Sequence, residues 1–304
     1  MRNGGGGVFD SLGGLDETVR AAYLRRLGVD AEPPSVQALR LLVQRHTERV
    51  PYETWWIAGG EGWTIDPVAA AERIALRSRG GYCYHLNGAL GLLLTSLGYR
   101  VRAHVGGVQG SRPDPEARGN HLVLTLTGLP SDDNPEGEWY VDVGLGDALR
   151  DPLPLVAGDY DQAPFRLGLA SDSSGRAADV VWTLTHDPAG GFGSMTWTGG
   201  PAVAADFVAK HEWLSTSPDS GFVQVPMCET RDASGVDVVR GLVLSRVGAG
   251  AFTADPITSP SAWFELLADR FSLTFDGSTP QWRRRLWEAV VARHEAWVGS
   301  QSPT

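Results

Sequence analysis

The sequence predicts an α+β protein, because helical, β-rich and mixed segments follow one another in three blocks. In residues 1–98, apolar side chains recur three and four positions apart, which is the spacing of amphipathic helices. In residues 99–200 the apolar pattern alternates, and turn residues separate the segments. Residues 201–304 mix the two patterns. We therefore expect an N-terminal helical domain, an antiparallel β-sheet or small barrel, and a C-terminal α/β domain.

Four helices are expected in the first block, over residues 15–29, 35–50, 66–81 and 83–98. Ser35 is the candidate N-cap of the second helix, because its hydroxyl can accept a hydrogen bond from the first turn. Gly80 and Gly81 are expected to end the third helix, and Gly98 is expected to end the fourth.

The second block is expected to form strands over residues 99–108, 121–130, 138–146 and 180–187. The third block is expected to form helices over 205–215, 264–271 and 280–299, and strands over 222–231 and 239–249. Four residues of the last helix lie four positions apart, which indicates that it packs against the domain: Trp282, Leu286, Val290 and His294.

Composition argues against several classes of protein. The formal net charge of the 304 residues is −10, and this acidic balance is unlike that of a nucleic-acid-binding protein. No apolar run reaches the roughly 18 residues of a membrane span, and the glycine-rich N-terminus lacks the apolar core of a signal peptide. The two cysteines form no CxxC pair and no cluster with histidines, so we expect no metal site and no disulfide. We expect a cytoplasmic protein.

The segment RGGYCYHLNG at residues 79–88 places Cys83 between two glycines and a predicted helix. The positive end of a helix dipole and a nearby imidazole would stabilise a cysteine thiolate there. A single cysteine in such a setting is either a nucleophile or a small buried residue, and this segment alone does not separate the two. Cys228 lies in a β pattern without a neighbouring base, so we interpret it as structural.

A cysteine nucleophile needs a histidine base, and His121 is the best placed of the seven histidines. It begins an apolar strand directly after a glycine-rich loop. His85 is closer to Cys83 in the sequence, but two positions along a helix put it about 200° around the axis, so it is expected to face away.

Asp142 lies in the next predicted strand, between two valines. A carboxylate in the middle of an apolar strand is costly unless it is paired. If the turn at 131–138 joins the strands as an antiparallel pair, Asp142 can approach His121 and orient its imidazole. The alternative is an aspartate that caps the turn before Gly144. Together with Cys83, the set predicts thiol acyl transfer in which the histidine moves the proton.

Five segments resemble, in their residues and their order, the motifs of one enzyme family: PYETW (51–55), RGGYCYHLNGAL (79–90), GNHLVLTL (119–126), YVDVGLGD (140–147) and LSTSPDSGF (214–222). The second resembles an RGG-aromatic-Cys motif with an asparagine four positions after the cysteine. On these segments the chain resembles the arylamine N-acetyltransferases and the related amide synthases.

The resemblance implies a helical bundle, a β-barrel and an α/β lid, arranged like a cysteine-protease core. The cysteine would lie in the first block, the histidine and the aspartate in the second, and the lid with the C-terminal helix in the third. It implies a ping-pong reaction: acetyl-CoA acylates Cys83, and an arylamine, hydrazine or hydroxylamine then takes the acetyl group. His121 and Asp142 carry over as the other triad members.

The resemblance also implies residues that contact the coenzyme or the acceptor: Asn120, Trp213, Thr216, Ser217 and Phe222. Three tryptophans follow the PYE segment, and they form either an aromatic wall for a planar amine or ordinary core packing: Trp55, Trp56 and Trp63.

The chain departs from the family pattern in ways that concern the acceptor pocket more than the triad. His85 stands where Glu or Gln is usual, Thr54 and Trp55 replace Asn and Leu, and Leu145 replaces Phe. Three other functions stay open. The chain could be an amide synthase that transfers a longer or carrier-protein-bound acyl chain, a thiol hydrolase, or a binding protein with an inactive triad.

Overall fold

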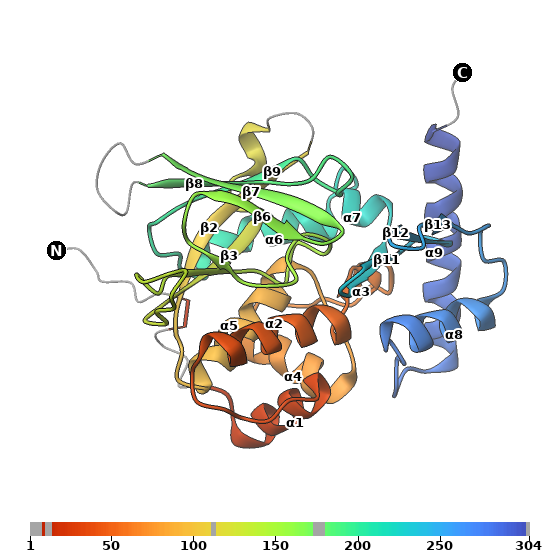
Figure 1. The fold of residues 1–304 in the computed structure, drawn as a ribbon. Coiled ribbons are helices and arrows are strands. Elements are labelled where there is room, and N and C mark those ends of the chain that lie inside the picture. The colour runs from red at the N-terminus through yellow and green to blue at the C-terminus, as the bar shows by residue number, and fades with distance from the viewer. Residues whose placement is uncertain (1–7, 10–13, 111–113, 173–179, 302–304) are drawn as a thin grey trace.

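The computed structural model describes residues 8–9, 14–110, 114–172 and 180–301 (Figure 1). Its α-helices are α1 (Glu17–Leu27), α2 (Val36–Arg49), α3 (Trp55–Ala58), α4 (Pro67–Arg77), α5 (Cys83–Ser96), α6 (Ala205–Thr216), α7 (Gly221–Gln224), α8 (Pro260–Phe271) and α9 (Pro280–Gln301). A 3₁₀ turn covers Pro115–Ala117.

The strands form two sheets. One sheet contains β2 (Arg100–Gln109), β3 (His121–Thr127), β4 (Trp139–Val141), β5 (Leu153–Pro154), β6 (Gly158–Gln162), β7 (Phe165–Asp172), β8 (Val181–Thr185) and β9 (Ser194–Thr198). The other contains β1 (Tyr52–Glu53), β10 (Met227–Arg231), β11 (Gly235–Arg240), β12 (Val243–Gly248) and β13 (Phe252–Thr253).

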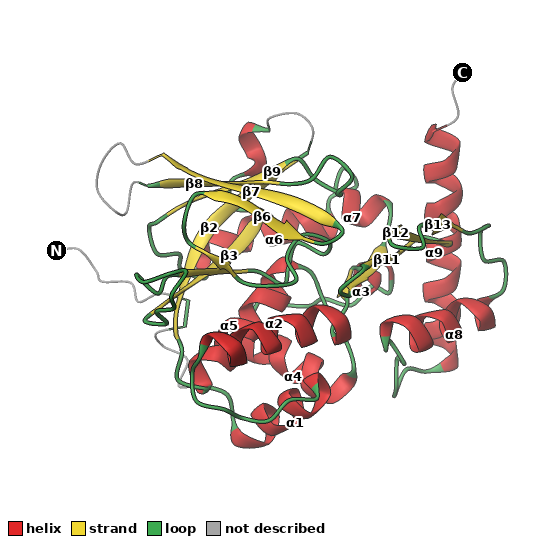
Figure 2. Cartoon of the chain, viewed as in Figure 1, coloured by secondary structure: helices red, strands yellow, loops and turns green. Residues whose placement is uncertain are grey.

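The three-part order predicted from the sequence is confirmed. Helices α1, α2, α4 and α5 cluster below the large sheet in Figure 1, and α8 and α9 lie beyond the small sheet. Figure 2 shows the same sequence of a helical part, a β part and a mixed part. The domain limits at residues 98 and 200 stay a prediction, because β1 of the N-terminal part pairs with β10 of the C-terminal part.

Two predicted features of the N-terminal helices have different outcomes. Ser35 caps α2 as expected, since its Oγ accepts a hydrogen bond from the Ala38 N–H at 3.1 Å. The prediction that Gly80 and Gly81 end the third helix is wrong. Helix α4 already ends at Arg77, because Ser78 adopts the left-handed conformation with φ of 49°. Gly80 instead allows a close approach, since a Cβ there would overlap the Pro51 carbonyl oxygen.

The eight-stranded sheet is antiparallel throughout, in the order β5-β4-β3-β2-β9-β8-β7-β6, and it curves toward a barrel. Along β3, Leu122, Leu124 and Leu126 join the core that includes α5, while Val123 joins a second core within the sheet. Four strands of this sheet were not predicted from the sequence (β5, β6, β7 and β9), and β6 shows why. Its residues GDYDQ are mostly polar and carry no alternating apolar signal.

The five-stranded sheet has two different faces. Cys228 and Val239 point into a core that includes Trp263 of α8 and Leu286 of α9, as expected for a structural cysteine and a docked C-terminal helix. Residues of the opposite face line a cavity, which is described below. The predicted strand 222–231 is wrong in its first part, where residues 221–224 form α7 instead.

The predicted strand 239–249 is likewise interrupted. The chain turns at Gly241, which has φ of 59°, between β11 and β12.

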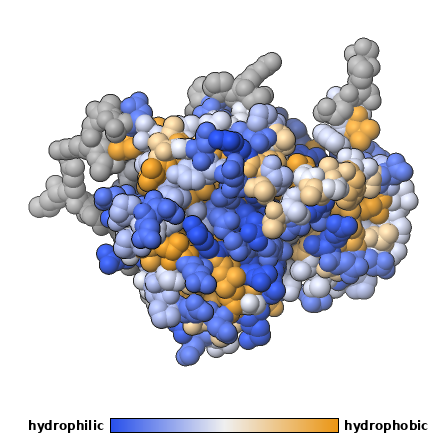
Figure 3. All heavy atoms as spheres, in the orientation of Figure 1, coloured by the Kyte–Doolittle hydropathy of each residue, from blue (hydrophilic) through white to orange (hydrophobic). Residues whose placement is uncertain are grey.

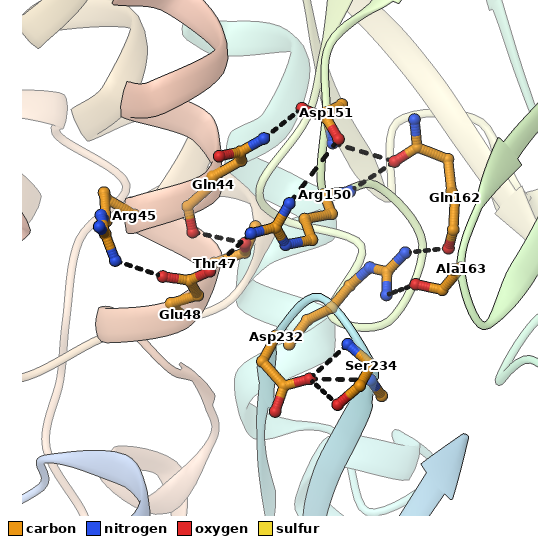
Figure 4. Close-up of polar contacts among 12 residues, drawn as sticks. Gln44, Arg45, Thr47, Glu48, Arg150, Asp151, Gln162, Ala163, Asp232 and Ser234 are labelled. Carbon is orange, nitrogen blue, oxygen red and sulfur yellow. Dashed lines mark hydrogen bonds and ion pairs between the residues drawn. The ribbon is translucent and has the colours of Figure 1, made fainter. Parts of the chain in front are cut away.

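A polar junction connects the helical part to the loop after β4 (Figure 4). Glu48 of α2 pairs with Arg150 at 2.8 Å, and Gln44 donates to the Asp151 carboxylate at 2.6 Å. The side-chain oxygen of Gln162, at the end of β6, accepts from the backbone N–H groups of Arg150 and Asp151, both at 2.9 Å. Helix α2, this loop and the barrel are therefore held as one unit.

Arg231 of β10 extends the same junction to the C-terminal part. Its guanidinium is fully buried and donates to the carbonyl oxygens of Ala148 at 3.1 Å, Ala163 at 3.2 Å, and Gln162. The Phe165 ring lies 5.5 Å from the guanidinium carbon. Burial lowers the pKa of Arg231 to about 10, so the group stays charged at neutral pH.

On the face shown in Figure 3, hydrophilic side chains cover much of the surface, and apolar side chains form separate patches. No helix in the described ranges is both long and apolar enough to cross a membrane.

Candidate active site

Cys83 is the first residue of α5 and is buried, with 4% of its surface exposed. The positive end of the helix dipole stabilises negative charge at this position. Its Sγ lies 3.4 Å from the carbonyl oxygen of Asn120, the residue before β3. The packing of α5 against β2 and β3 therefore brings the cysteine to the start of the strand that carries His121.

His121 and Asp142 meet as the sequence predicts. The imidazole Nε2 lies 2.6 Å from Asp142 Oδ2, and both side chains are buried. The register of β3 and β4 pairs Leu124 with Val141, which puts His121 and Asp142 on the same face. Because Nε2 is bound to the carboxylate, Nδ1 is the nitrogen left for the cavity, which Cys83 and His121 both line.

The prediction that Asp142 lies in the middle of a strand is wrong, because β4 ends at Val141. Its Oδ1 accepts a hydrogen bond from the Gly144 N–H at 2.8 Å, which is the turn-capping role given as the alternative. The same carboxylate therefore both caps the turn and holds His121. Two other side chains donate hydrogen bonds to the Asp142 carboxylate: the Asn87 amide to Oδ1 at 2.8 Å, and the Tyr140 hydroxyl to Oδ2 at 2.9 Å.

Asn87 and Tyr140 were not predicted as site residues, although the sequence carries a signal for each. Asn87 is four positions after Cys83, hence on the same helix face one turn further on. It also accepts from the Val143 N–H at 2.9 Å. Tyr140 is two positions before Asp142, hence on the same side of an extended chain.

The charge state of His121 is set by its neighbours. Burial alone lowers the pKa of His121, but the charges of Asp142 and Cys83 outweigh it and raise the pKa to about 10. These interactions stabilise the folded protein fully below about pH 6.5, the unfolded pKa, and are lost as the pH rises through about 10.

We therefore expect the His121 imidazolium to persist well above neutral pH. In ¹⁵N-labelled protein, its ring nitrogens should keep imidazolium shifts until about pH 10. In Asp142→Asn the titration should move to lower pH, because the main raising charge is gone. An unaltered titration near pH 6.5 in the folded wild-type protein would contradict the charge pair.

Gly144 lets the loop after β4 pass directly over Cys83. A Cβ at this position would lie 2.6 Å from the Cys83 Cα and 3.0 Å from Asn87 Nδ2. We expect Gly144→Ala to lower kcat/KM by about tenfold or more and stability by about 1–3 kcal/mol, since the backbone must move. Gly62→Ala is the matched control, because a Cβ there meets open space. Equal kinetics and melting temperatures for the two variants would refute this expectation.

His85 is not among the described residues that line the cavity beside Cys83, in agreement with the prediction that it faces away. It is fully buried, and its ring lies edge-on to Trp56 at 5.4 Å and to Trp63 at 5.7 Å. Its Nδ1 accepts from the Tyr82 N–H at 3.3 Å. Burial, with the charge of Arg73 as a smaller cause, lowers the pKa of His85 well below its usual value. His85 is therefore neutral and supports the start of α5 from outside the cavity.

A cavity of about 320 Å³ opens beside the cysteine. It is lined by Cys83 and His121 and, from the small sheet, by Tyr52, Met227, Glu229 and Arg240. Its size suits a small aromatic ring and a short acyl group. The three tryptophans do not line this cavity. Trp55 packs against Trp263 at 4.9 Å and Trp56 stacks on Trp63 at 5.1 Å, which matches the core-packing alternative.

The residues predicted to bind substrate lie in different places. Asn120 lines the cavity, but both polar ends of its side chain bond to the Val108 backbone, at 2.8 and 2.9 Å. Phe222 lines the cavity next to Tyr52, with ring centroids 6.2 Å apart. The other three are not among the described residues that line it, and their contact with substrate stays a prediction: Trp213, Thr216 and Ser217.

The chain matches the profile of a family described as N-acetyltransferase over residues 35–279. It is 33% identical to the arylamine N-acetyltransferase of Mycolicibacterium smegmatis over 211 residues, which are 66% of this chain and 72% of the relative.

Solved structures of such enzymes share the fold. The arylamine N-acetyltransferase from Salmonella typhimurium matches with a TM-score of 0.77 at 25% identity, over 91% of this chain and 99% of that chain. The Mycobacterium marinum enzyme in complex with CoA matches with a TM-score of 0.74 at 27% identity, over 89% and 97% of the two chains.

Fold and profile together define an enzyme of the acyltransferase class. More narrowly, the chain belongs to the arylamine N-acetyltransferase family.

Proposed function

We propose that the protein moves an acetyl group from acetyl-CoA to an aromatic amine, hydrazine or hydroxylamine through a thioester on Cys83. One observation carries the proposal. Cys83 and His121 line a common cavity, and the Asp142 carboxylate holds the far nitrogen of the imidazole at 2.6 Å. Family membership supports both the reaction and the acyl donor.

In the first half-reaction, the Cys83 sulfur attacks the thioester carbonyl of acetyl-CoA. A new S–C bond forms, the bond between the carbonyl carbon and the coenzyme sulfur breaks, and the coenzyme leaves as a thiol with the proton from His121. The Asp142 carboxylate keeps Nδ1 of the imidazole directed at the cavity throughout.

In the second half-reaction, the amine nitrogen attacks the acetyl thioester. His121, now neutral, accepts the proton that the nitrogen loses as the new amide bond forms. The bond between the carbonyl carbon and the Cys83 sulfur breaks and restores the starting thiolate and imidazolium. Asp142 stabilises the imidazolium in both halves, which is consistent with the raised pKa of His121.

Intact-protein mass spectrometry tests this sequence. Acetyl-CoA alone should add one acetyl group, peptide mapping should locate it on Cys83, and 4-methylaniline should remove it as the acetylated amine. An adduct only from long-chain or carrier-protein thioesters would assign the amide-synthase reaction. Loss of the adduct to water at the same rate with and without amine would assign a thiol hydrolase. No adduct from any thioester would refute the proposal.

A further inference from the structure

Glu229 is an acidic residue in the wall of the cavity, and the reaction above does not use it. We propose that Glu229 selects acceptors whose aromatic ring carries a second, positively charged group opposite the reacting nitrogen. This inference rests on the proposed function and names the class of amine that the cavity accepts best.

The small sheet directs Glu229 at the cavity. Glu229 lies in β10 two positions after Met227, and it pairs with Tyr52 of β1. Successive side chains of a strand point to opposite faces, and Cys228 between them is buried in the core with α8 and α9. Met227, Glu229 and Tyr52 therefore share the face that lines the cavity.

The loop that follows Asp142 contacts both Cys83 and Glu229. Gly144 lies against Cys83, and Gly146 lies against the Glu229 carboxylate, where a Cβ would overlap Oε2. Two residues of chain span at most about 7 Å. Cys83 and Glu229 therefore lie near each other along the same cavity, so an aromatic amine held at Cys83 can present its far substituent to Glu229.

The Glu229 carboxylate has no partner of its own. It makes no hydrogen bond and no ion pair with any other residue in the described ranges. Glu53, on the neighbouring strand β1, is by contrast held by Arg79 at 2.8 and 3.1 Å. Glu229 is partly exposed at the cavity, so its ionised carboxylate can bind a cation that arrives with the substrate without first losing a protein partner.

The charged and titratable groups that face Glu229 come from three directions. They are Tyr52 on β1, Asp147 in the loop after β4, and Arg240 on β11. Burial and the Asp147 charge raise the pKa of Glu229 to about 8, and Arg240 acts in the opposite direction. Asp147 is already bound, to His186 at 3.1 Å and to the Gly191 N–H. Glu229 is thus the acid that remains free to receive a cation.

Two acceptors of nearly equal shape test the idea: 4-(trimethylammonio)aniline, whose charge does not titrate, and 4-tert-butylaniline, which is neutral. The measured quantity is the ratio of their kcat/KM values with acetyl-CoA as donor. In the wild-type protein the cation-to-neutral ratio should rise about tenfold as the pH increases from 6.5 to 9.5, because Glu229 gains its charge near pH 8.

In Glu229→Gln this ratio should be low and independent of pH, because the group that distinguishes the two acceptors no longer ionises. Glu265→Gln is the matched control, since it removes one exposed carboxylate on α8, away from the cavity. Differences in the nucleophilicity of the two amines cancel when ratios are compared between variants.

The outcomes separate the two proposals. A ratio that Glu229→Gln leaves unchanged, or one that falls with rising pH in the wild type, overturns the role of Glu229 while acetylation of the neutral amine upholds the proposed function. Failure of the wild type to form an acetyl-enzyme or to acetylate either amine overturns the proposed function and this inference with it.

Discussion

Replacing Cys83 by alanine should lower acetyl transfer by at least about 10³-fold and should remove the acetyl adduct completely. The reason is chemical, because Cys83 is the only thiol among the described residues that line the cavity. The second cysteine, Cys228, is fully buried among the side chains that join the small sheet to α8 and α9. Burial also raises the pKa of the Cys228 thiol well above its usual value.

The measurement is the steady-state rate together with the mass of the protein after incubation with acetyl-CoA. Cys83→Ser keeps the size of the side chain and should also fail, since an alcohol is a far weaker nucleophile than a thiolate at neutral pH. Cys228→Ala is the control and should retain the adduct, with a loss of stability of about 1–2 kcal/mol at most. Full activity of Cys83→Ala would exclude the covalent mechanism.

Replacing Asp142 by asparagine should reduce kcat/KM by about 10⁴-fold with little change in the fold around the site. The amide keeps one oxygen but cannot carry the charge that stabilises the imidazolium. It can also present an N–H to His121 Nε2, which favours the tautomer with its proton on Nδ1 and removes the base from the cavity. The same change should lower the pKa of His121, because Asp142 is the main charge that raises it.

Tyr140→Phe is the matched comparison for Asp142→Asn. It removes one hydrogen bond to Asp142 Oδ2 and leaves the contact with His121 in place. We expect a loss of about ten- to a hundredfold, well below that of Asp142→Asn, since a hydrogen bond to a charged group contributes about 1.5–3 kcal/mol. Equal losses for the two variants would mean that Asp142 acts through the fold of the turn and not through the charge of the imidazole.

The triad geometry could be predicted because each part of it depends on local patterns. The start of α5 follows from two glycines and an apolar helical stripe, and the alternation along β3 fixes the face of His121. The antiparallel pairing of β3 with β4 then brings Asp142 to the same face. The end of β4 at Val141 could not be predicted, since it depends on a hydrogen bond between the Asp142 side chain and the Gly144 backbone.

The start of the lid was harder to predict because a side-chain cap overrides the strand pattern there. Residues 222–224 carry the alternating pattern of a strand, yet the Ser220 side chain caps a short helix there by accepting from the Phe222 N–H at 3.3 Å. The role of Glu229 could not be predicted from the sequence either. In the sequence Glu229 is an ordinary charged residue in a strand. Its place in the cavity wall depends on the pairing of β10 with β1, which is distant in the sequence.

The three backbone carbonyl oxygens that bind the Arg231 guanidinium, here called its carbonyl socket, limit how this chain can be recombined with its relatives. The arginine comes from the C-terminal part and the three carbonyl acceptors from the barrel, so a chimaera cut between residues 200 and 227 separates them. A graft without the arginine would leave up to three acceptors unsatisfied, at about 1–3 kcal/mol for each one that stays dry. Only parents that share both halves of this socket should therefore yield soluble hybrids at such a junction, whatever their catalytic residues.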